Sequence, residues 1–221
     1  MFKRILQRFV LLIFSVLIFL PDISMAFKRD TRCQILKDAI YLSPEPLRDY
    51  LIKNFQEVHD GVHFIDRNRN LVSVKDQDCI PRFARLHYKN LGKMLKKASY
   101  EDDYNAARSF GLVACFVAET ISPDNYRTSG KLVADEFKYD GYQKVGDVKE
   151  SIAGLIEKYR KPYQGVATRK VTDYLYSVAV NEIVDYWVSI WLASGRNPGK
   201  LRPTGFLIAR KKNKVLKLKF T

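Results

Sequence analysis

Apolar residues along most of this chain recur every three or four positions, which is the spacing of one face of an α-helix. The longest such stretch covers 167–194, and Gly195 directly after it favours a helix end, because glycine readily takes the C-cap conformation. Ser43 followed by Pro44 is typical of a helix start. We therefore expect one all-α domain, a helical bundle. Its helices are predicted around 35–40, 44–58, 91–98, 102–122, 145 or 148 to 159, and 167–194.

Two stretches lack this helical spacing. Residues 59–80 are rich in charged and turn-forming side chains, and they predict a long loop. Segment 205–221 is basic and finishes in a strict alternation of apolar residues and lysines. Alternation is the pattern of a strand, and lysines protect an exposed sheet edge. This segment therefore predicts either a short edge strand or a basic tail.

The first 26 residues have the organisation of a secretory signal peptide. Basic residues within 1–8 precede an uncharged apolar run over 9–20, and small residues end at Ala26. The apolar run is shorter than the roughly 20 residues that span a bilayer, although an uncleaved anchor that begins further upstream is the alternative. Cleavage near Ala26 would release a secreted or periplasmic protein without a transmembrane span. We divide that mature chain into a helical domain, 27–204, and the basic segment 205–221.

The charge of the chain is strongly positive. The full sequence carries 38 Lys and Arg against 24 Asp and Glu, a net charge of +14, of which the signal segment contributes +2. A mature chain of this charge is attracted to anionic partners such as phospholipid headgroups, nucleic acid or cell-wall polymers. The charge does not select among these partners. The alternative interpretation is that the charge serves only to keep the protein soluble.

The three cysteines form an odd set for a secreted protein. In an oxidising compartment, one disulfide could form and leave one thiol. If a pair forms, we favour Cys33 with Cys79, because Cys115 lies in an apolar helical stretch.

The segment HDGVHFID gathers His59, Asp60, His63 and Asp66 within eight residues. Imidazole and carboxylate groups both bind zinc, so the cluster is a candidate metal site. The alternative is a polar loop whose side chains are solvated.

The segment GLVACFVAETISP carries Cys115 and Glu119 four residues apart, on one face of the predicted helix. Thiolate and carboxylate both bind zinc, but a cysteine in such apolar surroundings is more often a small core residue. His87 lies on the apolar face of another predicted helix, where it is either a hydrogen-bonded core residue or a ligand.

Five segments in order along the chain share a wider pattern: GVHFIDRN, RLHYKNL, FGLVACFVAETISPDNY, EFKYDGY and YWVSIWLASGRNP. Together they resemble the secreted, all-α, zinc-dependent phosphodiesterases of the bacterial phospholipase C and S1/P1 nuclease superfamily. The resemblance implies that family's helical domain, three zinc ions and the hydrolysis of phosphodiesters.

The resemblance also implies one retained zinc site. Asp66, His87, Cys115 and Glu119 fall at the four ligand positions of one of the family's zinc ions. The family has histidine and aspartate where this chain has Cys115 and Glu119, but all four residues present are competent zinc donors. We therefore expect one zinc ion at these four residues.

The family's other two sites are depleted in this chain. Phe27 stands where the family has its amino-terminal tryptophan ligand, and the first-helix histidine has no equivalent, with Arg32 or Cys33 near its place. Asn125 and the pair of Glu136 and Asp140 fall at further ligand positions. Oxygen donors suit magnesium, calcium or manganese better than zinc. We keep these three residues as secondary metal candidates, together with His59 and His63.

These departures favour a weakly active or non-catalytic protein with a degraded trinuclear site, which binds anionic partners that contain phosphodiesters. One alternative is an active secreted metal-dependent phosphoesterase that acts on phospholipid or nucleic acid. The other alternative is an unrelated helical envelope protein.

Overall fold

The structure is a computed structural model that describes residues 27, 29–68, 79–97, 100–122, 134–163 and 168–209. Most of these residues are helical, which confirms the all-α class, while the phospholipase C/P1 nuclease type stays a prediction. The predicted signal segment, 1–26, and the alternating residues near the carboxyl end lie outside the described residues. None of the described helices is long and apolar enough to cross a membrane.

Eight α-helices and two short strands make up the described chain. The helices are α2 (Arg29–Leu42), α3 (Glu45–Lys53), α4 (Phe55–Val62), α5 (Phe64–Arg67), α6 (Cys79–Met94), α7 (Tyr100–Ile121), α8 (Val148–Leu155) and α9 (Arg169–Ala193). A π turn, Ile156–Arg160, and a 3-10 turn, Lys161–Tyr163, continue α8. The strands are β1 (Glu136–Lys138) and β2 (Leu207–Ala209).

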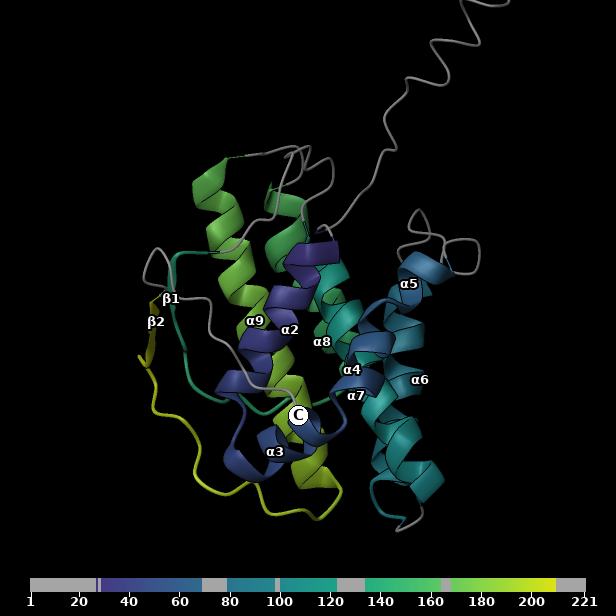
Figure 1. Ribbon diagram of the computed structural model, residues 1–221. Helices are drawn as coiled ribbons and strands as arrows, with labels where there is room; N and C mark the ends of the chain where they lie inside the picture. Colours follow the sequence, from purple (N-terminus) through teal and green to yellow (C-terminus); the bar gives the residue numbers. More distant parts are fainter. Residues whose placement is uncertain are drawn as a thin grey trace, which may run out of the picture.

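Helix α7 forms the centre of the bundle, where α4, α6 and α9 pack against it (Figure 1). Residues 106–122 of this region are buried with one exception, Arg108, because an α-helix that is apolar around its circumference must be covered on all sides. Trp187 of α9 is fully buried, and its indole N–H donates to the Phe110 carbonyl of α7 over 3.0 Å. The bundle therefore holds α7 rigidly against its neighbours.

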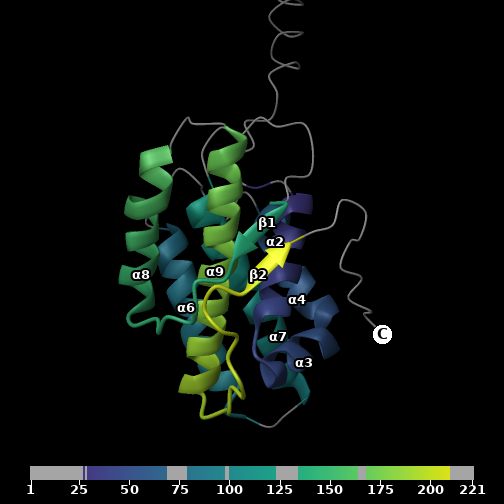
Figure 2. The same cartoon turned by 90° about the vertical axis from the view of Figure 1, so that its left-hand side faces the viewer.

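The two strands form an antiparallel pair at the edge of the bundle, beside α9 and α2 (Figure 2). Phe137 pairs with Ile208, and both side chains are buried against the helices. A strand was one of the two predictions for the carboxyl-terminal segment, and it forms at Leu207–Ala209. The alternating residues that suggested it lie further along the chain, outside the described residues.

The predicted loop over 59–80 is wrong in its first part, because α4 and α5 continue the helical structure to Arg67. Val58, Val62 and Ile65 are buried at helical spacing and anchor this region on the core. Residues 69–78 lie outside the described part. The predicted helix over 44–58 is divided at Asn54, whose side-chain amide donates to the Tyr50 carbonyl over 2.9 Å and ends α3.

Buried carboxyl groups on α9 make the stability of the fold depend on pH. Asp185 is 5% exposed and accepts a hydrogen bond from the Gln143 backbone N–H over 2.8 Å. Burial raises the pKa of Asp185 to about 8 and that of Glu182 to about 7. The folded state therefore holds protons that the unfolded chain releases near pH 4, so stability falls as pH rises from about 4 to about 8.

We predict that Asp185→Asn removes most of this loss, because its amide oxygen still accepts the Gln143 N–H but carries no charge. The variant should exceed the wild type in unfolding free energy at pH 8 by at least about 1.4 kcal/mol, the equivalent of one pKa unit. Urea unfolding at pH 5 and pH 8 measures this. Asp49→Asn is the control, because the Asp49 side chain is 65% exposed. Equal pH dependence of Asp185→Asn and the wild type would contradict the prediction.

Candidate metal centre

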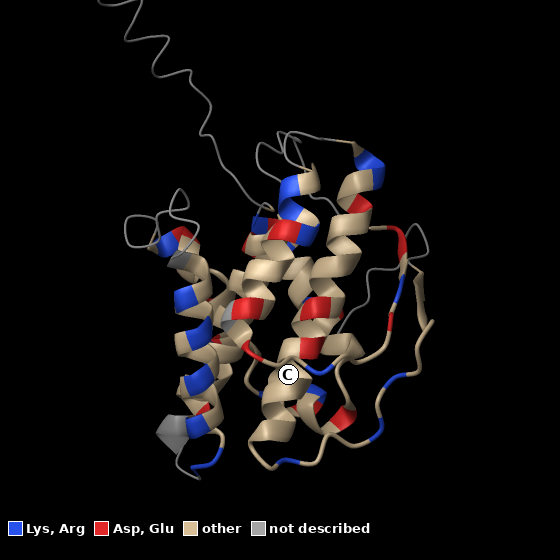
Figure 3. Cartoon of the chain, turned by 180° about the vertical axis from the view of Figure 1, so that it is seen from behind, with Lys and Arg blue, Asp and Glu red and all other residues tan. Residues whose placement is uncertain are grey.

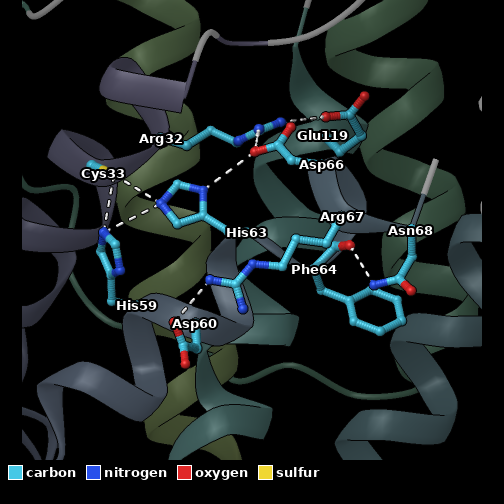
Figure 4. A network of polar contacts seen from close by, with 10 residues as sticks. All are labelled: Arg32, Cys33, His59, Asp60, His63, Phe64, Asp66, Arg67, Asn68 and Glu119. Carbon is cyan, nitrogen blue, oxygen red and sulfur yellow. Dashed lines mark hydrogen bonds and ion pairs between the residues drawn. The ribbon is translucent and has the colours of Figure 1, made fainter.

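Three metal-capable side chains converge between α2 and α4 (Figure 4). Cys33 comes from α2, while His59 and His63 lie four residues apart at the end of α4. The Cys33 Sγ is 3.6 Å from His59 Nε2 and 3.3 Å from His63 Nε2, and the two Nε2 atoms are 3.2 Å apart. Among the described residues, this is the only group of three or more Cys, His, Asp or Glu ligand atoms within 4.8 Å of one another.

These distances match three edges of a zinc tetrahedron. With Zn–N of about 2.05 Å and Zn–S of about 2.3 Å, tetrahedral angles put two nitrogens about 3.3 Å apart and a nitrogen about 3.6 Å from a sulfur. The observed separations, 3.2, 3.3 and 3.6 Å, fit one ion bound by all three atoms. A three-ligand set leaves the fourth tetrahedral position to water or to another ligand.

Asp66 orients His63 from the other side of its ring. The carboxylate lies 3.2 Å from His63 Nδ1, and because an ionised carboxylate only accepts, Nδ1 carries the proton. The lone pair of Nε2 is then directed at Cys33 and His59. A carboxylate on the distal nitrogen of a ligating histidine is a common arrangement at zinc sites, where it fixes the tautomer.

The electrostatics of the cluster keep its imidazoles neutral, as metal ligands must be. Burial lowers the pKa of His63, although Asp66 opposes this effect, and burial also lowers the pKa of His59. Burial alone would raise the pKa of Asp66, but the Arg32 guanidinium and His63 outweigh it and hold that pKa below its usual range. The pKa of the Cys33 thiol is raised by burial, so binding of a cation would have to displace its proton.

Arg32 lies between two of the predicted ligands. Its guanidinium forms an ion pair with Asp66 and a second one, at 3.4 Å, with Glu119. Arg32 and Glu119 are 5% and 2% exposed. An arginine side chain therefore occupies the space between the carboxylates that the resemblance assigns to a zinc ion.

The structure does not gather Asp66, His87, Cys115 and Glu119 into a ligand group. Cys115 does lie near the two carboxylates, but it is fully buried, and this burial raises its pKa to about 12. Such a thiol stays protonated and behaves as a small core side chain. Asp66 and Glu119 both form ion pairs with Arg32, and the four-residue ligand set stays a prediction.

His87 lies among aromatic side chains, in contact with the rings of Phe116 and Phe64. Its ring stacks on Phe116 at 5.9 Å between centroids and lies 6.4 Å from the Phe64 ring. Burial, helped by the nearby charge of Arg108, lowers its pKa. The structure therefore supports the interpretation of His87 as a packed side chain on the apolar face of α6.

The secondary candidates have different outcomes. His59 and His63 are brought together with a third ligand, as described above. Glu136 is exposed on β1, and Asp140 follows that strand, where its backbone N–H donates to the Asn181 side chain over 3.2 Å. Asn125 lies outside the described residues. Glu136 and Asp140 belong to no metal-capable group among the described residues.

Sequence reasoning missed Cys33 as a member of this metal-capable group. The favoured pairing of Cys33 with Cys79 is wrong for this structure, in which Cys33 is a free thiol that faces the two histidines. One signal was present, since Cys33 falls near the place of the family's first-helix histidine. The i, i+4 spacing of His59 and His63 was a second signal, but it has meaning only on a helix.

The chain was compared with protein-family models, curated proteins and solved structures, and none of them matches it.

Proposed function

We propose that the protein binds one zinc ion through Cys33, His59 and His63. The observation that carries this proposal is the convergence of the three ligand atoms at tetrahedral separations. The contact of Asp66 with the distal nitrogen of His63 adds support, because it orients the histidine as a ligand. A thiolate with two imidazoles favours zinc over magnesium or calcium, which prefer oxygen ligands.

We further propose that this site is the single metal centre of a secreted, phospholipase C/P1 nuclease-like protein that binds anionic phosphodiester partners without efficient turnover. Phosphodiester cleavage at clustered metals uses one ion to activate water and others to stabilise the leaving oxygen. One three-ligand group among the described residues supplies only part of this arrangement. The net charge of the full chain, +14, supports attraction to anionic partners.

A specific observation also favours a second candidate function, a zinc-dependent phosphoesterase with one metal. The centre has three protein ligands, and both Cys33 and His59 are partly exposed. Catalytic zinc sites have three protein ligands and one open position, at which the ion acts as a Lewis acid.

Metal content tests the first proposal directly. We expect the purified full chain, equilibrated with zinc and desalted, to retain one equivalent by elemental analysis. Cobalt substitution should add the thiolate charge-transfer absorption of a Cys-ligated ion. Cys33→Ser and His63→Ala should each lower zinc affinity at least about 100-fold, because each removes one of only three protein ligands.

Two matched variants control for loss of a thiol or an imidazole elsewhere. Cys115→Ala and His87→Gln should both keep one zinc ion, since neither residue belongs to the cluster. If both of these variants lose zinc and Cys33→Ser keeps it, the ligand set predicted from the sequence, with His87 and Cys115, would be supported instead. A wild-type chain without zinc would leave the three side chains as a hydrogen-bonded cluster and refute the proposal.

A chromogenic phosphodiester separates the two functions. Hydrolysis that requires zinc and is abolished by Cys33→Ser would establish the phosphoesterase. One bound zinc without hydrolysis would support the binding protein.

A further inference from the structure

A cavity of about 530 Å³ opens between α6 and α7, with Phe64 in its wall and none of the three metal-capable residues in its lining. Three cationic side chains line it: Lys93 and Lys97 from α6 and the turn after it, and Arg108 from α7. None of the described residues that line it is Asp or Glu. Neither Lys93 nor Arg108 forms an ion pair with a described residue.

The inner wall of this cavity contains both apolar side chains and hydrogen-bonding side chains. Phe64 and Leu112 supply apolar surface, and Asn90 and Ser109 supply hydrogen-bonding groups. Ser109 is only 6% exposed, so it lies in the buried part of the cavity wall. Cations at a cavity with an apolar wall are complementary to a ligand that has an anionic group and an apolar portion.

A row of positive charge leads along α6 to the cavity. Four cationic residues of α6 recur at helical spacing and are all exposed: Arg82, Arg85, Lys89 and Lys93. Figure 3 shows Lys and Arg positions repeated along this helix. Arg85 has an acidic partner, Asp147, at 3.6 Å. A surface of one sign raises the local concentration of ligands of the opposite sign.

We propose that this cavity is a binding site for an amphiphilic phosphate monoester or similar organic anion, held by Lys93 and Arg108 with its apolar portion against Phe64 and Leu112. The site is separate from the metal cluster and does not depend on the proposed zinc ion. The anionic group could belong to a small phosphate ester or to a lipid headgroup, and the experiment below separates these two sources.

Calorimetric titration of the full chain with hexyl phosphate, inorganic phosphate and hexanol tests the site. We expect saturable 1:1 binding of hexyl phosphate at least about tenfold tighter than that of inorganic phosphate, because several methylenes leave water. Hexanol should bind more weakly than hexyl phosphate, since it cannot form charge-assisted hydrogen bonds. Lys93→Gln and Arg108→Gln should each weaken hexyl phosphate binding about tenfold or more.

Lys89→Gln is the matched control, because it removes one charge from the same helix without lining the cavity. This variant should change the hexyl phosphate affinity less than about twofold. Equal weakening by Lys89→Gln and Lys93→Gln, or the absence of saturable binding, would overturn the proposal. Cys33→Ser should bind hexyl phosphate as the wild type does, so that failure of the zinc proposal and failure of this one are distinguishable.

Vesicles of phosphatidylglycerol and phosphatidylcholine identify the source of the anion once hexyl phosphate binding is established. A lipid headgroup in the cavity predicts that Arg108→Gln weakens vesicle binding about tenfold, while Lys89→Gln, which removes only surface charge, weakens it less than about twofold. If both variants weaken vesicle binding equally, the membrane senses only surface charge, and the ligand of the cavity is a small phosphate ester.

Discussion

Replacement of Arg32 by methionine is expected to destabilise the protein by about 3–5 kcal/mol, the usual cost of removing one member of a buried ion pair. The methionine keeps most of the side-chain volume but removes the charge that pairs with both Asp66 and Glu119. Glu119 is 2% exposed, so water cannot replace the guanidinium without opening the core. The two carboxylates would also repel each other, which adds to the loss.

Denaturant unfolding at pH 7 measures this loss, and Arg48→Met is its control. Arg48 forms a surface pair with Asp49 at 3.8 Å, so its replacement should cost less than about 1 kcal/mol. The double variant Arg32→Met/Glu119→Leu should recover part of the stability, because it removes a buried charge together with its partner. A loss in Arg32→Met no larger than that in Arg48→Met would contradict the buried network.

The same substitution should disturb the metal cluster. Asp66 contacts both Arg32 and His63, so Arg32 holds the carboxylate that orients the histidine. Loss of a carboxylate that orients a ligating histidine typically weakens metal binding about 10–100-fold. Asp66→Asn removes this carboxylate directly. It should therefore lower zinc affinity by this amount while the three proposed ligands stay in place.

The helical class of the fold could be predicted from sequence because the pattern that indicates a helix lies within the helix's own residues. Each long helix repeats apolar residues at a fixed spacing, and this spacing alone identifies its buried face. The second half of helix α4 escaped prediction because its polar residues, among them His59 and Asp60, resemble those of a loop. Its helical structure depends on the burial of Val58 and Val62 against α7, which is a tertiary interaction.

The candidate site could be predicted only in part, because its geometry depends on residues far apart in sequence. His59 and His63 were recognised as metal-capable, but Cys33 lies 26 residues before His59 and meets it only when α2 packs near α4. Asp66 was expected to be a ligand, whereas in the structure it is the hydrogen-bond partner of His63. Nothing local in the sequence indicates that Arg32 would lie between Asp66 and Glu119.

Two glycines set the distance between α4, which carries the histidines, and the central helix α7. A Cβ atom on Gly61 would lie 2.1 Å from the Arg108 carbonyl oxygen, and one on Gly111 would lie 1.9 Å from the Val58 carbonyl oxygen. Both obstacles are backbone atoms of the facing helix, so no side-chain rotation relieves them. Any larger residue would have to push the two helices apart.

Gly61→Ala and Gly111→Ala are therefore each expected to cost about 3 kcal/mol or more, at the upper end of the range for overpacked cores. The control is Gly154→Ala on α8, where a Cβ meets no atom within 4 Å. It should stabilise the protein by about 0.5–1 kcal/mol, since alanine favours helix over glycine. Urea unfolding of the three variants measures both effects.

Zinc affinity should depend on the distance between α4 and α7, and not only on the stability of the fold. Gly111 lies on α7, far in sequence from the three ligands, yet its substitution moves the helix that carries His59 and His63. We expect Gly111→Ala to bind zinc at least about tenfold more weakly under conditions where the variant is still folded, because a metal centre requires its ligands in near-ideal geometry. Unchanged zinc affinity in a destabilised Gly111→Ala would mean that α2 and α4 hold the centre without help from α7.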